Sequence, residues 1–170
     1  MADLGAYVGD TVLSYIKNYG PDCYKRIYCY EITKENFDIM ERSLAGIRDI
    51  SMRLKGVGDR GGIMGVEQNS ASFSANRLSD EGQGVEVVTL DEDIKEPLTI
   101  IKADIEGWEQ KALMGSVRHI INDHPKLLIS VYHGNEDLWK IPQMIYDMSD
   151  DYRFFLRFRG SAVYPTEIVL

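Results

Sequence analysis

Hydrophobic and polar positions follow two periods along this chain. Apolar residues recur at helical spacing in four stretches, and four short runs rich in β-branched and aromatic residues have the composition of buried strands. The predicted helices cover residues 11–19, 33–47, 110–121 and 141–148. The predicted strands cover residues 26–31, 50–57, 98–103 and 126–132. Because strands and helices alternate, the pattern predicts a doubly wound α/β fold with a mostly parallel sheet.

Three parts of the chain depart from this alternation. Residues 62–90 are rich in turns and contain short apolar runs, which favours a small β insertion. Residues 152–158 and 162–170 can form a closing antiparallel pair. Only residues 1–4 precede the first glycine turn, although a buried strand takes about five residues. We therefore expect one domain over residues 1–170 that is part of a longer polypeptide extending upstream.

The charge balance narrows the classes of partner. The chain has 170 residues, a formal net charge of −8 and a sequence pI of about 4.9. An acidic surface disfavours binding to nucleic acid or to an anionic membrane, and no apolar run approaches the roughly 20 residues that span a bilayer. Cys23 and Cys29 lack metal-binding spacing, which indicates a reducing cytoplasm and no zinc site.

A glycine turn follows the first apolar residues, in Asp3-Leu-Gly5-Ala-Tyr7-Val-Gly9. In the G-x-G-x-x-G turn of a dinucleotide fold, the second glycine makes room for a pyrophosphate. Tyr7 occupies that position here, so the turn suits a pyrophosphate poorly. A nicotinamide-dependent oxidoreductase is therefore disfavoured. The turn suits a ligand that passes close to the backbone without phosphates, such as S-adenosylmethionine. Glu31 ends the second strand, where its carboxylate can accept hydrogen bonds from ribose hydroxyls. The alternative is an ordinary strand–turn–helix connection with a solvated Glu31.

Two carboxylates, Asp104 and Glu106, come directly after the apolar strand 98–103. This is the carboxyl end of a buried strand, where parallel sheets bind ligands. Their pairing could raise one pKa and create a base, whereas helix capping and dipole complementation by Glu106 and Glu109 are the alternative. His133 ends the next strand and could accept a proton from a substrate hydroxyl, or have a structural role. A metal held by these three residues is chemically feasible, but nothing in the spacing requires one.

Eight short segments follow one another in an order that is specific as a combination. They are residues 3–10, 30–31, 89–91, 101–107, 112–115, 130–133, 137–139 and 167–170. In this order they resemble the FkbM-type methyltransferases, a branch of the class I S-adenosylmethionine-dependent enzymes. The resemblance covers nearly the whole chain.

The resemblance implies a class I methyltransferase domain over residues 1–170, with a seven-stranded, mostly parallel sheet and a reversed last strand. It also implies that S-adenosyl-L-methionine donates a methyl group to oxygen. The acceptor would be a hydroxyl on a small molecule, a carbohydrate or natural product. We expect no nucleic acid and no membrane as partner. Neither the identity of the acceptor nor the oligomeric state follows from the sequence.

Site residues are predicted from these motifs and from their places at strand ends. The predicted catalytic residues are Asp104, Glu106 and His133. The predicted cofactor-binding residues are Asp3, Gly5, Ala6, Tyr7, Gly9, Glu31 and Asp59. By resemblance, Asp3 orders the glycine turn or contacts the methionine part of the cofactor; a capping carboxylate is the alternative. Asp59 either reads the adenine amino group or is a turn aspartate, and Asp91 is expected to cap the segment before strand 98–103.

A second hypothesis keeps the fold without the catalysis. The chain would then be a regulatory domain that binds S-adenosylmethionine and transfers nothing. The carboxylates at positions 104 and 106, together with His133, argue against this reading.

Overall fold

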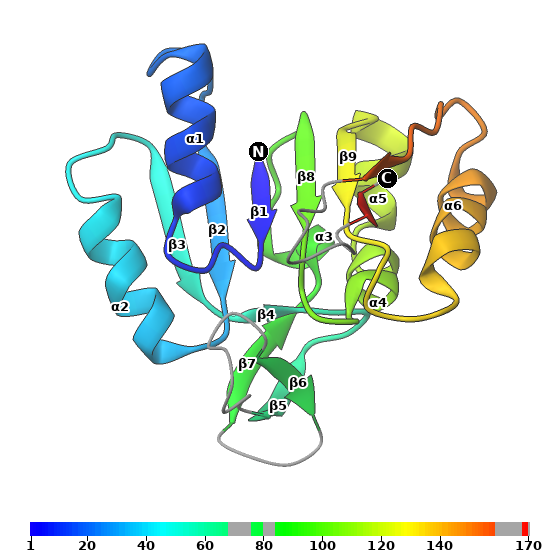
Figure 1. The fold of residues 1–170 in the computed structure, drawn as a ribbon, viewed down its shortest axis with the longest axis horizontal. Coiled ribbons are helices and arrows are strands. Elements are labelled where there is room, and N and C mark those ends of the chain that lie inside the picture. The colour runs from blue at the N-terminus through cyan, green and yellow to red at the C-terminus, as the bar shows by residue number, and fades with distance from the viewer. Residues whose placement is uncertain (68–75, 80–83, 159–167, 170) are drawn as a thin grey trace.

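Five parallel strands form the central sheet of the computed structural model (Figure 1). The structure describes residues 1–67, 76–79, 84–158 and 168–169. The strands lie in the order β3 (Ile50–Leu54), β2 (Ile27–Glu31), β1 (Ala2–Leu4), β8 (Ile100–Ala103) and β9 (Lys126–Ile129). The order reverses between β1 and β8, which makes the carboxyl ends of these two strands the switch point at which such sheets bind ligands. The predicted α/β fold with a mostly parallel sheet is confirmed.

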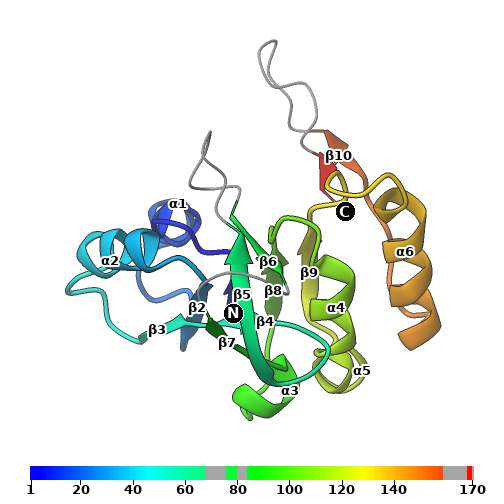
Figure 2. The same cartoon turned by 90° about the horizontal axis from the view of Figure 1, so that it is seen from below.

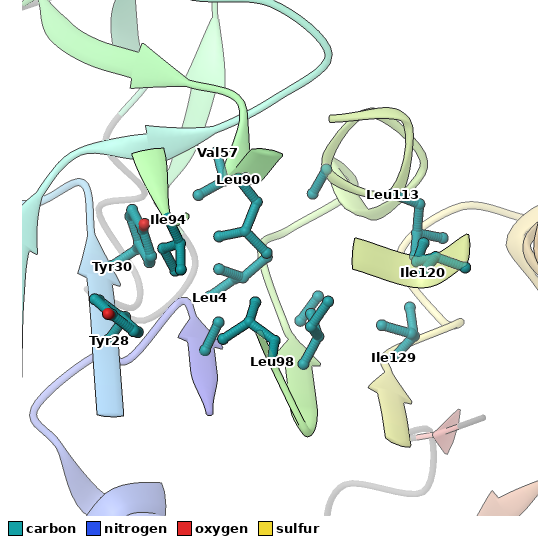
Figure 3. Close-up of a cluster of buried hydrophobic side chains, with 14 of the residues drawn as sticks. Leu4, Tyr28, Tyr30, Val57, Leu90, Ile94, Leu98, Leu113, Ile120 and Ile129 are labelled. Atoms are coloured by element: carbon teal, nitrogen blue, oxygen red, sulfur yellow. The ribbon is translucent and has the colours of Figure 1, made fainter. Parts of the chain in front are cut away.

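Helices cover both faces of this sheet. They are α1 (Asp10–Tyr19), α2 (Lys34–Ser43), α3 (Leu90–Asp93), α4 (Glu109–Met114), α5 (Val117–Asp123) and α6 (Asp137–Met148). Helices α1 and α2 pack on one face, against Ile27 and Cys29 of β2. The other helices pack on the opposite face, where Tyr28 and Tyr30 of the same strand lie (Figure 3). Strand β2 is buried throughout because its alternating side chains feed two separate cores.

Two predicted helices have different bounds. The single helix predicted over residues 110–121 is two helices, α4 and α5, interrupted at Gly115. A Cβ at Gly115 would lie 1.9 Å from the Gly58 backbone oxygen, so the chain comes too close there for any side chain. The last helix begins at Asp137 and not at residue 141, so Pro142 lies inside it and not near its start.

A small second sheet lies where the β insertion is predicted, below the central sheet in Figure 1. Its strand order is β4 (Gly56–Val57), β7 (Val85–Val88), β5 (Gly62–Glu67) and β6 (Arg77–Ser79). The predicted third strand, residues 50–57, is therefore divided between two sheets. Parts of the insertion, residues 68–75 and 80–83, lie outside the described residues.

The end of the chain contributes a short antiparallel pair, β10 (Arg157–Phe158) and β11 (Ile168–Val169). Figure 2 shows β10 and the C-terminus on the same side of the molecule as α6. Val169 also makes an isolated antiparallel bridge to Ser130, just beyond β9. Among the described residues the central sheet thus has five hydrogen-bonded strands, with β11 adjoining it through one bridge. Most of the predicted pair, residues 159–167, lies outside the described part of the chain.

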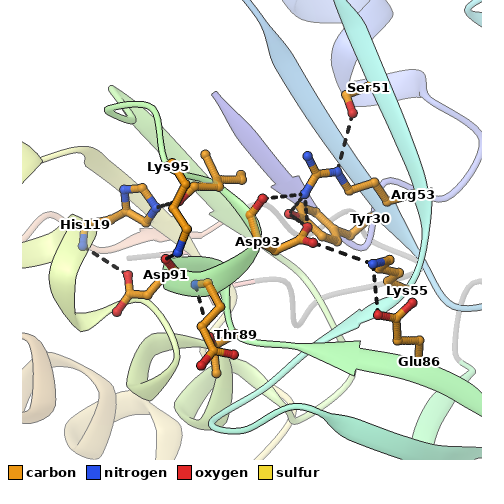
Figure 4. Close-up of polar contacts among 12 residues, drawn as sticks. Tyr30, Ser51, Arg53, Lys55, Glu86, Thr89, Asp91, Asp93, Lys95 and His119 are labelled. Carbon is orange, nitrogen blue, oxygen red and sulfur yellow. Dashed lines mark hydrogen bonds and ion pairs between the residues drawn. The ribbon is translucent and has the colours of Figure 1, made fainter.

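A polar network ties the central sheet to α3 (Figure 4). Arg53 of β3 forms an ion pair with Asp93, whose carboxylate also accepts a hydrogen bond of 2.6 Å from the Tyr30 hydroxyl. Lys55 adds ion pairs to Asp93 at 3.6 Å and to Glu86 of β7 at 3.0 Å. These contacts connect β2, β3, β7 and α3. No helix in the described part of the chain is both long and apolar enough to cross a membrane.

Candidate active site

The glycine turn between β1 and α1 passes directly against the loop that follows β8. Gly5, Tyr7 and Gly9 all have left-handed backbone angles, with φ of 74°, 51° and 85°. A Cβ on Gly5 would lie 2.0 Å from the Asp104 backbone oxygen. Only glycine fits this approach, which brings the predicted cofactor turn and the predicted catalytic strand end together.

Asp3 lies beneath this turn, fully buried. Its carboxylate is 3.0 Å from Lys102 Nζ, although the pair lacks hydrogen-bond alignment, and Lys102 also donates to the Gly5 carbonyl at 2.7 Å. Burial raises the pKa of Asp3 above its ordinary value, and the positive charge of Lys102 opposes this. Asp3 therefore supports the turn through Lys102 and does not itself line the cleft described below.

Glu31 closes the turn from the end of β2. Its two carboxylate oxygens accept hydrogen bonds from the Tyr7 backbone N–H at 3.0 Å and from the Thr33 backbone N–H at 2.8 Å. Burial raises the pKa of Glu31, whereas these N–H groups lower it. Because the residue is only 6% exposed, the alternative of a solvated Glu31 is wrong.

A narrow cleft runs along these strand ends. Its lining includes Gly5, Tyr7, Glu31, Asp104 and Glu106. These five predicted site residues are therefore brought together. Apolar side chains of the small sheet and of the loop before α4 complete the walls; they are Val57, Leu78, Ile105 and Trp108.

Four predicted cofactor-binding residues, Asp3, Ala6, Gly9 and Asp59, are absent from this lining. Gly9 lies against Leu44, because a Cβ there would come within 2.9 Å of that side chain. Ala6 is buried in the core under α1 and α2, where it shapes the turn from behind. Asp59 is exposed in the turn after β4, and it does not line the cleft. Its predicted contact with adenine remains a prediction without support from this geometry.

The predicted catalytic residues form one cluster with a further carboxylate. His133 Nε2 lies 3.6 Å from Asp104 Oδ1 and 3.5 Å from Glu106 Oε2. On the other side of the ring, His133 Nδ1 lies 2.9 Å from Glu109 Oε1. The Tyr132 hydroxyl donates a hydrogen bond of 3.0 Å to Asp104. The ends of β8 and β9 and the first turn of α4 thus bring three carboxylates and one imidazole to the same place.

The sequence predicts Glu109 only as a residue that caps a helix or complements its dipole, and not as a member of this cluster. Its side chain is 1% exposed, and its oxygens accept hydrogen bonds from the backbone N–H groups of Ile105 at 2.8 Å and Gly107 at 3.0 Å. Its place in the first turn of α4 suggests helix-dipole complementation, which explains these local contacts. The contact with His133 depends on how the loop folds, and no local motif signals it.

The electrostatics of the cluster favour a charged imidazole. Burial opposes protonation of His133, but the three nearby carboxylates outweigh it and raise the pKa of the ring above its ordinary value. Burial also raises the pKa of Glu106, and the positive charge of His133 opposes that shift. The carboxylates therefore favour the protonated form of His133 more than the surroundings of an isolated histidine would.

A second, more polar cleft of about 520 Å³ opens beside the cluster. It is lined by residues from the small sheet, from α4 and from the loop before α6, among them Arg77, Ser79, Gln110 and Glu136. His133 also lines it, and Glu106, Trp108 and Leu78 line both clefts. The two clefts therefore adjoin each other at Glu106, beside the acid–histidine cluster.

The cluster also has donor atoms close enough for a metal ion. One ligand atom from each of Asp104, Glu109 and His133 lies within 4.8 Å of the others. Carboxylate and imidazole ligands suit several divalent ions. Glu109 also accepts two backbone hydrogen bonds, so a metal bound here would share its carboxylate with the contacts that fix the loop.

Comparison with known proteins gives the family. A family model described as the methyltransferase FkbM domain matches residues 3–162. The crystal structure of methyltransferase FkbM from Methylobacillus flagellatus KT has a TM-score of 0.81 and 26% identity, over 99% of this chain and 42% of that one. The chain thus spans less than half the length of that relative. Comparison with curated proteins gave no match.

More distant structures share the fold. One, from Streptococcus mutans and assigned as a methyltransferase in complex with SAH, has a TM-score of 0.55 and 11% identity, over 99% of this chain and 84% of that one. Another, from Clostridium thermocellum and assigned as an rRNA-methylase, has a TM-score of 0.57 and 10% identity, over 99% of this chain and 83% of that one. Because the family model spans residues 3–162 of this 170-residue chain, the chain belongs to the FkbM methyltransferase family.

Proposed function

We propose that this domain is an S-adenosylmethionine-dependent O-methyltransferase that acts on a hydroxyl group of a sugar or natural product. The observation that carries the proposal is the pair of adjoining clefts with Glu106 in the wall of both and His133 beside it. The narrow cleft would hold the methyl donor, and the polar cleft would hold the acceptor. The donor and acceptor would then meet at the acid–histidine cluster.

The residues of the narrow cleft fit S-adenosylmethionine chemically. The turn at Gly5 lets a ligand approach the backbone closely, and the Glu31 carboxylate lines the cleft, where a carboxylate is the kind of acceptor that suits ribose hydroxyls. Val57, Leu78 and Trp108 supply apolar surface suited to adenine. When bound, S-adenosylmethionine supplies a methyl group already activated on a sulfonium.

The protein's own contribution is then orientation and proton removal. Binding in adjoining clefts aligns donor and acceptor. An alcohol oxygen gains positive charge as its bond to carbon forms, and the carboxylates of Asp104 and Glu106 stabilise that charge. The imidazole of His133, when neutral, takes the hydroxyl proton. The polar lining of the second cleft, with Ser79, Gln110 and Glu136, suits a polyhydroxylated acceptor.

The proposal also includes the number of strands in the sheet and the location of the protein in the cell. The bridge between Val169 and Ser130 supports β11 as the reversed strand of a seven-stranded sheet with β10 at its edge. The free cysteines Cys23 and Cys29 support a cytoplasmic location.

The proposal is tested by incubating the domain with labelled S-adenosylmethionine and a panel of carbohydrates and natural products. Transfer of label to an acceptor hydroxyl is the expected result. Calorimetry should show S-adenosylhomocysteine binding that Glu31→Ala weakens about 5–150-fold, since two hydrogen bonds contribute about 0.5–1.5 kcal/mol each. Glu35→Ala, an exposed glutamate on α2, is the control and should bind normally.

The second candidate, a regulatory domain without catalysis, predicts a different result. It would bind S-adenosylhomocysteine with the same dependence on Glu31 and transfer no label to any acceptor. Tighter binding of NAD than of S-adenosylhomocysteine would contradict both candidates.

A further inference from the structure

Resting on the proposed function, we infer that Glu109 is a positioning residue that orients His133 as the proton acceptor and fixes the loop that carries Glu106. The position of Glu109 at the centre of the cluster motivates this. It contacts the ring nitrogen of His133 that faces away from Asp104 and Glu106, and it binds the backbone on both sides of Glu106.

The loop between β8 and α4 has a conformation that needs support. Glu106 and Gly107 both have left-handed backbone angles, with φ of 55° and 93°. Such a conformation is uncommon for a residue with a side chain and is strained. The Glu109 carboxylate accepts hydrogen bonds from the residues on either side, Ile105 and Gly107, and so stabilises the turn. The place of the Glu106 side chain in the wall of both clefts depends on this turn.

The same carboxylate determines which nitrogen of His133 is free. Glu109 lies 2.9 Å from Nδ1, so the proton of a neutral ring stays on Nδ1 and the lone pair is on Nε2. Nε2 faces Asp104 and Glu106, which line the clefts. Neither ring nitrogen has a well-aligned hydrogen bond among the described residues. Catalytic hydrogen bonds are often loose in a free enzyme and tighten when substrate binds.

The charges that face His133 come from every element around it. Asp104 and Glu106 follow β8, Glu109 begins α4, and the Tyr132 ring lies with its centroid 4.1 Å from that of the imidazole. Asp137 of α6 lines the same cleft. Glu109, Glu106 and Asp104 raise the pKa of His133 although burial opposes that shift. Because the base is the neutral ring, turnover should rise with pH as His133 loses its proton.

Glu109→Gln tests the inference with little change in shape. The amide oxygen can still accept one backbone hydrogen bond, but the negative charge beside Nδ1 is lost. We expect kcat to fall about 10²-fold or more, because the ring loses the negative charge that holds its proton on Nδ1 and stabilises the imidazolium formed when Nε2 takes the hydroxyl proton. The KM of the acceptor and the dissociation constant of S-adenosylhomocysteine should stay within about threefold. The acidic limb of the pH profile should move to lower pH, because the pKa of His133 falls.

The control is Glu35→Gln, the same substitution in the first turn of α2 at an exposed site. It should leave kcat, KM and the pH profile unchanged. Nitrogen NMR of the free protein provides a readout independent of turnover. In the wild type, neutral His133 should carry its proton on Nδ1 and titrate above its ordinary pKa, and in Glu109→Gln it should titrate lower.

Several results would overturn the inference. The first is a neutral His133 ring in the wild type that carries its proton on Nε2. The second is a pKa of His133 that Glu109→Gln leaves unchanged. The third is a loss of S-adenosylhomocysteine affinity in Glu109→Gln that is as large as the loss of kcat. Wild-type activity that a chelator abolishes and Mg²⁺ restores would instead assign Glu109 to metal binding. Failure of the proposed function has a separate signature, because the wild type would then transfer no label while the NMR titrations still behave as expected.

Discussion

Gly5 is the residue at which the fold and the candidate site constrain each other most directly. Its φ of +74° is strained for other residues, and a Cβ there would lie 2.0 Å from the Asp104 backbone oxygen. Two separate costs therefore oppose any side chain at this position. One is local backbone strain, and the other is a clash that would push the β8 strand end away from the turn.

Gly5→Ala should therefore destabilise the protein by more than the roughly 1–3 kcal/mol of backbone strain alone. The matched control is Gly46→Ala, where φ is +80° but nothing lies within 4 Å of an added Cβ. Urea unfolding of both variants measures the free energies of unfolding. Equal losses would show that the contact with Asp104 adds no cost and would contradict the close approach described here.

At this scale the sequence predicts the site's composition better than its geometry. Asp104, Glu106 and His133 are predicted because parallel strands deliver their carboxyl ends to one edge. Glu109 is missed because its contact with His133 depends on the left-handed turn at Glu106, which no spacing rule anticipates. Asp59 is placed with the cofactor by its position after a strand, but β4 leaves the central sheet there and carries Asp59 into an exposed turn.

At the scale of elements, periodicity predicts the existence of helices more reliably than their limits. The apolar spacing continues through Gly115, so it cannot reveal that the backbone there packs against Gly58 and that α4 ends. The α6 helix begins four residues earlier than residue 141, at Asp137, because Asp137 accepts a hydrogen bond of 2.6 Å from the Gly134 backbone. Such contacts at helix ends are not visible in the spacing of apolar residues.

The start of α5 offers a test of a contact between elements. Its N-cap residue, Ser116, makes no side-chain cap, because its hydroxyl donates to Ala112. Asp91 of α3 accepts hydrogen bonds from the Arg118 and His119 backbone N–H groups instead, at 2.8 Å and 3.2 Å. Asp91 therefore caps α5, and the expectation that it caps the segment before strand 98–103 is wrong.

Asp91→Ala should lower the free energy of unfolding by about 0.5–2 kcal/mol, the usual cost of losing a cap. Glu92→Ala, at the exposed neighbouring position, should be close to neutral and serves as the control. Thermal and denaturant unfolding would measure both. A variant at residue 91 as stable as the control would refute the capping role.

At the scale of the whole molecule, the alternation of strands and helices is sufficient to predict the fold class. The acidic net charge and the lack of an apolar run long enough to span a bilayer lead us to expect neither nucleic acid nor a membrane as partner. The small sheet is predicted only as an insertion, because short irregular strands give little periodic signal. Its contribution to both clefts, through Leu78, could not be predicted, since it depends on how the small sheet packs against Trp108, whose indole N–H donates to the Leu78 carbonyl at 3.1 Å.

Cofactor binding should be visible in the stability of the entire chain. S-adenosylhomocysteine at about 100 times its dissociation constant should add about 2.7 kcal/mol, because it binds only the folded state. For a chain of this size that corresponds to a rise in Tm of roughly 5–11 °C. Thermal scans with NAD at the same concentration provide the comparison and should show a smaller shift. An equal or larger shift with NAD would argue against the proposed ligand.

The walls of the polar cleft come from two parts of the chain, which bears on how the choice of substrate can change. The acid–histidine cluster comes from the strand ends and α4, whereas the opposite wall, with Met64, Glu67 and Arg77, comes from the small sheet. If the domain acts as proposed, the small sheet would help to select the acceptor, together with Gln110 and Glu136, and would supply none of the proposed proton-transfer groups. Exchange of the segment from 62 to 90 would then alter the acceptor that fits while Asp104, Glu106 and His133 stay in place. On this proposal the small sheet is the segment to exchange when the domain is to accept a new substrate.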